Sequence, residues 1–190
     1  MSGLGKEMKI KKTMLIGISG KSKSGKDTVV NIMRDSGYKV FSVSPGDKIR
    51  DAVASITGVS PKWLLDNEDR YGFIRSALQN VSSVARHRRP DYWWSLVKKD
   101  LILALDSKKY QFVVVPSIRL MLEANDILKM SGELWRIHRP IPKLKGDMGT
   151  HDTETELDEW KRWDAVFHNI LTLEHFKRSV QSLLAIKIQQ

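Results

Sequence analysis

The sequence predicts an α/β fold of three layers, with a parallel central sheet of about five strands flanked by helices. Two observations predict it. Short apolar runs alternate with longer amphipathic stretches along the whole chain, a pattern typical of strands joined by helical crossovers, which run parallel and are buried on both faces. In addition, the 190 residues are 41% hydrophobic and 28% charged, which is enough for one core. We therefore expect residues 1–190 to form a single domain.

Each predicted element follows from its local pattern. Short runs rich in apolar and β-branched residues predict strands. In chain order these are 13–18, 39–43, 111–115, 133–137 and 164–167. Longer stretches with apolar residues three and four apart predict helices. In chain order these are 26–35, 47–56, 70–87, 91–106, 119–130 and 172–187. Pro90 separates the third helix from the fourth, because proline cannot continue a helix.

The loop between the first strand and the first helix has the sequence GKSKSGKDT. Gly20, Gly25 and Lys26 fall at the spacing G-x-x-x-x-G-K, which in a strand-loop-helix context is the phosphate-binding P-loop. Glycines let the backbone turn its amide groups toward phosphate oxygens, and the helix N-terminus adds positive potential. We therefore expect Lys26 to reach the terminal phosphates of a nucleoside triphosphate. Asp27 stands where the motif ordinarily has Ser or Thr, and the hydroxyl of Thr28 follows, which leaves the metal ligand open. An ordinary solvated turn is the alternative.

The helix at 70–87 predicts a second candidate surface. Arg75, Gln79, Ser82 and Arg86 lie in one stripe at about 100° per residue. Two arginines with an amide between them can grip a phosphate and hydrogen-bond a nucleobase, whereas a solvated helix face is the alternative. On the next helix, the pattern favours packing over base stacking for the Trp93–Trp94 pair.

Ligands of such sheets bind where the strands end, so segments following different strands should share one rim. Asp47 and Lys48 follow the second strand, and Ser117 and Arg119 follow the third. Glu123, one helical turn beyond Arg119, either pairs with it or holds it toward the rim. Ser117 occupies a position where P-loop kinases often keep a carboxylate near magnesium.

The segment 139–156 follows the fourth strand and begins at Arg139. Its basic and polar composition predicts a lid that closes over phosphates, with a plain surface loop as the alternative. His151, Asp152 and Glu154 near its end are explained by helix capping better than by metal binding.

Composition narrows the function classes. The formal net charge of +10 suits nucleotide phosphates or nucleic acid, but the basic residues are spread from Lys6 to Lys187, so nucleic acid is not required. The chain has no cysteine, which excludes disulfides, cysteine-ligated zinc and thiol catalysis, and its five histidines lie outside H-x-x-x-H spacing. No apolar run approaches the roughly 18 residues of a membrane span, and the first run lacks a signal-peptide cleavage site. We expect a cytoplasmic protein with no membrane partner.

Together these segments resemble the deoxynucleoside monophosphate kinases of bacteriophages and bacteria, a P-loop kinase group related in pattern to phosphomevalonate kinase. The resemblance covers nearly the whole chain, and the Ser-Gly-Lys-Asp-Thr ending of the loop makes Asp27 normal for that family. The segments that carry it are Gly20 to Thr28, Asp47-Lys48, Arg75 to Arg86, Val113 to Arg119 with Glu123-Ala124, Gly132 to Pro140, His151 to Asp158 and His168 to Glu174.

The resemblance implies transfer of the terminal phosphoryl group of ATP, with Mg²⁺, to a deoxynucleoside monophosphate, in the host cytoplasm if the source is viral. The region 47–106 would bind the acceptor, and 139–156 would be the lid. The residues implied for ATP are Gly20, Ser24, Gly25, Lys26, Asp27, Thr28 and, near the adenine, Asn169. Those implied for the acceptor are Asp47, Lys48, Arg75, Gln79 and Arg86. Asp27 and Thr28 would hold the metal, while Lys26, Arg119 and Arg139 would stabilise charge on the transferred group.

Two residues depart from the family pattern. Ser117 replaces an aspartate of the family's Asp-x-Arg, which bears on magnesium binding, and Thr153 replaces a serine but keeps the hydroxyl. Two other functions therefore stay open: a kinase of another small phosphorylated acceptor, and a catalytically impaired nucleotide-dependent protein that binds nucleic acid or a protein partner. A homodimer is compatible with the sequence.

Overall fold

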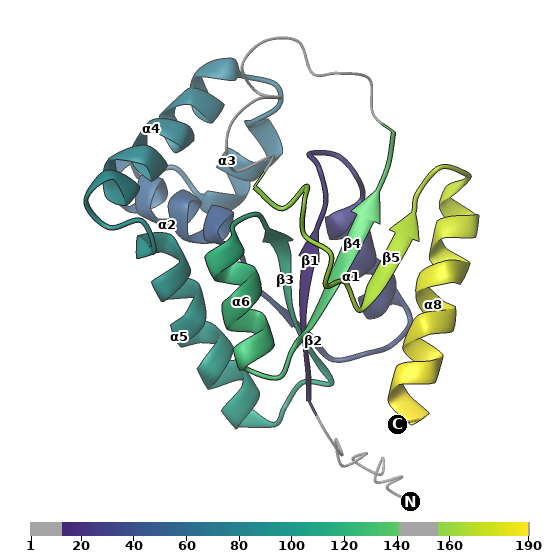
Figure 1. Cartoon of the computed structure of the whole chain (residues 1–190). Coiled ribbons are helices and arrows are strands. Elements are labelled where there is room, and N and C mark those ends of the chain that lie inside the picture. The colour runs from purple at the N-terminus through teal and green to yellow at the C-terminus, as the bar shows by residue number, and fades with distance from the viewer. Residues whose placement is uncertain (1–12, 141–155, 190) are drawn as a thin grey trace, which may run out of the picture.

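The computed structural model describes residues 13–140 and 156–189. Its strands form one parallel five-stranded sheet in the order β2-β3-β1-β4-β5 (Figure 1). They are β1 Met14–Ser19, β2 Val40–Ser42, β3 Phe112–Ile118, β4 Glu133–His138 and β5 Ala165–His168. The predicted α/β class with a parallel sheet is confirmed. β3 extends beyond its predicted end, so Ser117 lies inside the strand rather than after it.

Helices flank this sheet at nearly the predicted positions. They are α1 Lys26–Asp35, α2 Pro45–Thr57, α3 Pro61–Asn67, α4 Gly72–Arg88, α5 Tyr92–Ser107, α6 Met121–Lys129 and α8 Leu173–Gln189. The sequence analysis missed α3. Its start nevertheless has a local signal, because the side chain of Ser60 accepts a hydrogen bond from the backbone N–H of Trp63, and Pro61 occupies the first helical position.

Different helices cover the two faces of the sheet (Figure 1), and each face carries its own apolar core. On one face, α1 and α8 pack on residues such as Ile16 and Phe112, and on the other α5 and α6 pack on Leu15 and Val113. Neighbouring residues of β1 and β3 thus point to opposite faces, and both are buried, as expected of a parallel sheet covered on both sides.

A third apolar cluster lies among α2, α3 and α4, which form a group beside α5 at the upper left of Figure 1. Leu64 of α3 packs there with Ile74 and Leu78 of α4. Trp93 and Trp94 of α5 are buried, and their indole N–H groups donate to the backbone oxygen of Ser82 and to a side-chain oxygen of Asp126. The prediction that these tryptophans pack is confirmed.

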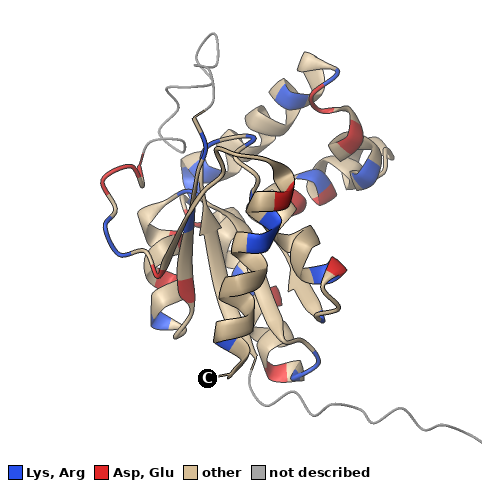
Figure 2. Cartoon of the chain, turned by 90° about the vertical axis from the view of Figure 1, so that its right-hand side faces the viewer, with Lys and Arg blue, Asp and Glu red and all other residues tan. Residues whose placement is uncertain are grey.

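Charged residues lie mainly on the helices and loops, whereas the strands are largely free of them (Figure 2). Within residues 13–140 and 156–189, no helix is both long and apolar enough to cross a membrane. The carboxyl ends of the strands form the rim where the sequence places its candidate residues.

Candidate active site

The loop after β1 takes a backbone path that depends on its glycines. Gly20 and Gly25 have φ angles of 153° and 108°, which residues with a side chain rarely adopt. Gly25 directly precedes α1, and no side chain caps that helix. The N–H groups of the first turn of α1 are therefore not taken up by a cap, which is the arrangement that helix-terminal phosphate sites use.

Lys26, the first residue of α1, folds back over the loop. Its side-chain Nζ donates to the carbonyl oxygens of Gly20 at 2.7 Å and Lys21 at 2.8 Å, and the residue is only 8% exposed. The Ser24 hydroxyl is fully buried and has no hydrogen-bond partner in the described part of the chain. Buried polar groups are nearly always satisfied. An unsatisfied hydroxyl inside this loop therefore marks a place where an anionic ligand would supply the missing contact.

Two segments that are distant in sequence also contact the loop. The side chain of Asn169, which follows β5, donates to the carbonyl oxygen of Ser24 at 2.9 Å. Its backbone N–H donates to His138 at the end of β4. Arg139 reaches the loop at Lys23 through a long contact of 3.4 Å. Asn169 and Arg139 therefore lie beside the loop, while Asp27 is exposed and Thr28 half-buried on the first turn of α1.

A small cation-lined cavity of about 10 Å³ lies beside the loop, between the ends of β1, β3 and β4, which leaves room for roughly one water molecule. Its lining residues are Ser19, Gly20, Lys21, Ile118, Arg119, Arg136 and Leu157. Three cationic side chains around so small a space suit the oxygen of an anion. Of these three cations, Arg119 was predicted from the sequence as a site residue, whereas Lys21 and Arg136 were not.

Asp158 holds two of these cations in place. Its carboxylate pairs with Lys21 at 2.6 Å and with Arg136 at 3.0 Å, while Arg136 also donates to the Ser19 hydroxyl at 3.0 Å. Desolvation acts to raise the pKa of Asp158, but the hydrogen bonds and charges of Lys21 and Arg136 outweigh it and hold that pKa below its ordinary value. Lys21 and Asp158 lie 137 positions apart, and Arg136 and Ser19 lie 117 apart, so no local sequence pattern predicts these two contacts.

Glu123 is a buried carboxyl beneath the β3–α6 turn, with 4% of its surface exposed. It accepts hydrogen bonds from the backbone N–H groups of Arg119 at 2.8 Å and Leu120 at 3.1 Å. Burial raises the pKa of Glu123, although those hydrogen bonds and the charge of Arg119 oppose the shift. Burial likewise lowers the pKa of Arg86, which the charge of Glu123 opposes and that of Arg119 reinforces. The charge of Glu123 thus acts on Arg86 of α4, while its carboxylate holds the backbone of the turn that carries Arg119.

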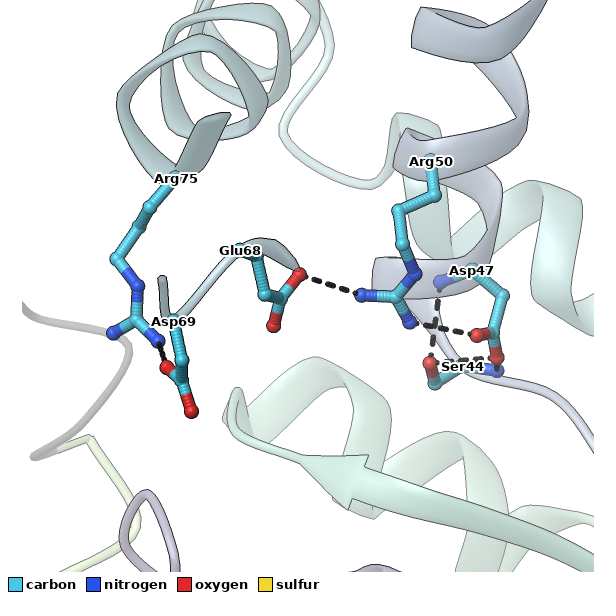
Figure 3. Close-up of polar contacts among 6 residues, drawn as sticks. All are labelled: Ser44, Asp47, Arg50, Glu68, Asp69 and Arg75. Carbon is cyan, nitrogen blue, oxygen red and sulfur yellow. Dashed lines mark hydrogen bonds and ion pairs between the residues drawn. The ribbon is translucent and has the colours of Figure 1, made fainter. Parts of the chain in front are cut away.

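The first turn of α2 is capped by its own side chains. Asp47 accepts from the backbone N–H and the hydroxyl of Ser44, both at 2.8 Å, and pairs with Arg50, which in turn reaches Glu68 at 3.2 Å (Figure 3). Lys48 forms an ion pair with Asp100 of α5. Asp47 and Lys48 thus join the elements of the helical region to one another.

Arg75, by contrast, is linked to the P-loop. Asp69, in the turn between α3 and α4, pairs with Arg75 through one carboxylate oxygen (Figure 3) and with Lys23 of the loop through the other, at 3.4 Å. The first turn of α4 therefore lies close to the loop. Gln79 is exposed on the same helix, while residues 141–155 of the predicted lid, with His151, Asp152 and Glu154, lie outside the described residues.

No family model matches this sequence, and no curated protein matches it. Solved structures do. A tunicamycin resistance protein from Deinococcus radiodurans has a TM-score of 0.54 at 13% identity, with 91% of this chain and 96% of that chain covered. TT1252 from Thermus thermophilus has a TM-score of 0.50 at 18% identity, with 92% and 98% covered. A dephospho-CoA kinase from Campylobacter jejuni has a TM-score of 0.50 at 16% identity, with 92% and 97% covered. At these identities the likeness shows only that this chain has a fold similar to theirs.

Proposed function

We propose that this protein is an ATP-dependent kinase that transfers the terminal phosphoryl group of ATP to a deoxynucleoside monophosphate, in the cytoplasm. The observation that supports the proposal is that the loop after β1 and the first turn of α4 lie close together, joined through Asp69. The P-loop has an uncapped helix start and a buried lysine, and Asp69 ties this loop to Arg75 at the start of α4. A donor site and a cationic helix suited to a second phosphate thus lie side by side.

On the donor side, Gly20, Ser24, Gly25 and Lys26 would cradle the ATP phosphates. Lys26 would exchange its two loop carbonyls for phosphate oxygens, and the Ser24 hydroxyl would gain the partner it lacks. Asn169, anchored to the loop, would lie near the adenine. Such a site stabilises charge that spreads over the transferred group, which is the main demand of phosphoryl transfer.

On the acceptor side, Arg75, Gln79 and Arg86 would hold the monophosphate, with Asp47 and Lys48 at its edge. Arg119 and Arg139 would neutralise charge near the transferred group, and we add Lys21 and Arg136 because they line the same small cavity as Arg119. No general base is required, since the second ionisation of a phosphate monoester has a pKa of about 6. Positioning the two phosphates in line would supply most of the rate enhancement.

The residues present fit magnesium that binds mainly through the nucleotide. Among residues 13–140 and 156–189, no group of three or more His, Cys, Asp or Glu side chains could hold a metal alone. Magnesium commonly binds one or two protein groups together with substrate phosphates and waters. Asp27 and Thr28, on the first turn of α1, would fill that role. When bound, magnesium would neutralise negative charge on the phosphates, and Ser117 offers a hydroxyl where the family that the sequence resembles has a carboxylate.

Two other functions follow from particular residues. The first is a kinase of a different small phosphorylated acceptor, because sequence motifs define the donor side better than the acceptor side. A nucleotide-dependent protein that binds nucleic acid or a protein partner follows from Ser117 together with the net charge of +10. Steeply salt-dependent DNA binding without turnover would favour the latter.

The test is ADP formation from ATP and magnesium with each deoxynucleoside and ribonucleoside monophosphate in turn, with Lys26→Ala as the blank. Turnover confined to one or a few monophosphates is the expected result and names the acceptor. Measurable ATP binding without turnover of any monophosphate would contradict the proposal and favour one of the two other functions.

A further inference from the structure

Asp69 is a carboxylate between two cations that come from different parts of the fold. One oxygen pairs with Arg75 of α4, and the other lies 3.4 Å from Nζ of Lys23 in the P-loop. The proposed function assigns Arg75 to the acceptor phosphate and the loop to the donor. Asp69 therefore bridges the two halves of the site with a small, two-oxygen anion.

The preceding residue shows what a structural carboxylate looks like in the same turn. Glu68 points the other way, to Arg50, which also pairs with the Asp47 that caps α2 (Figure 3). The Arg50 and Glu68 side chains are 14% and 26% exposed, so this pair is largely shielded from water. The Asp69 side chain is 59% exposed, its Lys23 partner is 62% exposed, and it caps no helix. Exposed ion pairs contribute little net stability, so packing does not account for Asp69.

We propose that Asp69 stands in for the phosphate of the acceptor. This inference rests on the proposed function and deepens it by naming the residue that sets acceptor affinity. Without substrate, the carboxylate occupies the space between Lys23 and Arg75. A phosphate monoester carries nearly two negative charges and three terminal oxygens, so it interacts more strongly with the same two cations and displaces Asp69. Asp69 then lowers affinity for every anion and penalises singly charged ones most.

The matched pair of variants is Asp69→Asn and Asp66→Asn. Asp66 lies three residues earlier and pairs with Lys62 within α3 at 2.6 Å. Both variants remove one negative charge from the same stretch of chain, but only Asp69→Asn removes the carboxylate between Lys23 and Arg75. The difference between them isolates that contact from the general effect of net charge.

The first measurement is the binding of inorganic phosphate by ³¹P NMR, which needs no turnover. We expect Asp69→Asn to tighten binding about threefold to tenfold, as the loss of two exposed ion pairs predicts, and Asp66→Asn to change it by less than about twofold. The gain should vanish when Arg75→Ala is added, because the cation that pairs with Asp69 on α4 is then absent. Weaker binding in Asp69→Asn, a change no larger than in Asp66→Asn, or a gain that survives Arg75→Ala would each overturn the inference.

The turnover assay run in parallel separates this inference from the proposed function. If no monophosphate is phosphorylated but Asp69→Asn tightens phosphate binding in an Arg75-dependent way, the proposed function fails and the inference stands. If a monophosphate is phosphorylated but its KM and phosphate binding change equally in the two variants, the inference alone fails. If turnover occurs and Asp69→Asn alone lowers the KM, both stand.

Discussion

Among the helices that begin at the rim of the sheet, α1 follows β1 and α2 follows β2, and the first turns of these two are built in opposite ways. α1 starts at Gly25 without a side-chain cap, whereas at α2 Ser44 and Asp47 cap each other's backbone N–H groups. A helix start closed by its own side chains offers little to a phosphate, while an uncapped one offers both N–H donors and positive potential. Of these two helix starts, the one at α1 is therefore the better suited to an anion.

The same contrast extends to the side chains around each start. Ser24 and Lys26 are buried and are positioned by the loop and the sheet edge. On the acceptor side, Arg75 is positioned mainly by surface charges such as Asp69, which a ligand can replace. We infer that the donor site is preorganised by the backbone, whereas the acceptor site is assembled by exchange of ion partners. Substitutions on the two sides should therefore differ in which measured quantity they change, as well as in the size of the change.

Lys26→Ala should have the largest effect, on the donor side. We expect kcat for ADP formation to fall about 10²- to 10³-fold, since removal of one preorganised donor of this type costs that much. The fold should persist, because the strand and helix around the loop keep their packing, and circular dichroism with thermal unfolding would show this. Lys129→Ala, which removes an exposed lysine on α6, is the control for lost charge. Equal kcat values in the two variants would remove Lys26 from the donor site.

A pair of glycine substitutions tests whether the donor loop alone depends on its backbone. A Cβ on Gly20 would lie 2.6 Å from both the carbonyl oxygen of Ile137 and the hydroxyl of Ser24, and the φ angle of 153° adds strain. Gly20→Ala should therefore cost about 2–3 kcal/mol in the free energy of unfolding. A Cβ on Gly72, at the start of α4, would meet nothing within 4 Å, so Gly72→Ala should be neutral or stabilise by up to about 1 kcal/mol. Urea unfolding measures the free energy of unfolding of both variants. Equal losses would show that the donor loop depends on its glycine no more than the start of α4 does.

The donor half was the more predictable half from sequence, for a physical reason. The loop is local: Gly20, Gly25 and Lys26 lie within seven residues, and the flanking strand and helix are fixed by apolar spacing. All five strands were likewise predicted near their observed positions, because buried parallel strands are short apolar runs. By contrast, α3 was missed because its seven residues bury only Leu64 and show little periodicity.

The contacts that complete the site were not predictable in the same way. Lys21 and Asp158 lie 137 positions apart, and Asp69 reaches both Lys23 and Arg75 only because of how α3 and α4 pack with α2 and α5. Ion pairs of this kind have no sequence period. The helical stripe and the resemblance to a kinase family both selected Arg75 and Arg86, but neither indicated which carboxylates accompany them.

Arg86→Ala should produce a middle-sized effect that is confined to the acceptor. Arg86 is half-buried near Glu123 and Arg119, and loss of a charge-assisted hydrogen bond to phosphate should raise the acceptor KM about tenfold or more. The KM for ATP should change much less. Arg88→Ala is the matched control, because Arg88 lines a shallow hollow with Val84 and Tyr92 elsewhere on the helix. An unchanged acceptor KM in Arg86→Ala would exclude Arg86 from the site.

Glu123→Gln should have the smallest effect, one that appears only as a dependence on pH. The glutamine oxygen can still accept from the N–H groups of Arg119 and Leu120, so the turn should keep its shape. In the folded wild type, burial raises the pKa of Glu123 above its unfolded value. Folded Glu123 therefore takes up a proton before the unfolded chain does as the pH falls, and this stabilises the folded wild type.

The variant has no such proton to bind. Relative to Glu123→Gln, the wild type should gain stability as the pH falls from 7 through the raised pKa toward the ordinary carboxyl value, and lose it again as the pH rises. Urea unfolding of both proteins at pH 7 and near pH 5 measures this difference, since titrations shared by the two chains cancel. If the wild type instead gains free energy of unfolding relative to the variant as the pH rises, the hydrogen bonds and the nearby arginines outweigh burial. Glu123 would then be a carboxylate bound firmly to Arg86 and Arg119, and the acceptor side would be more preorganised than its exposed ion pairs indicate.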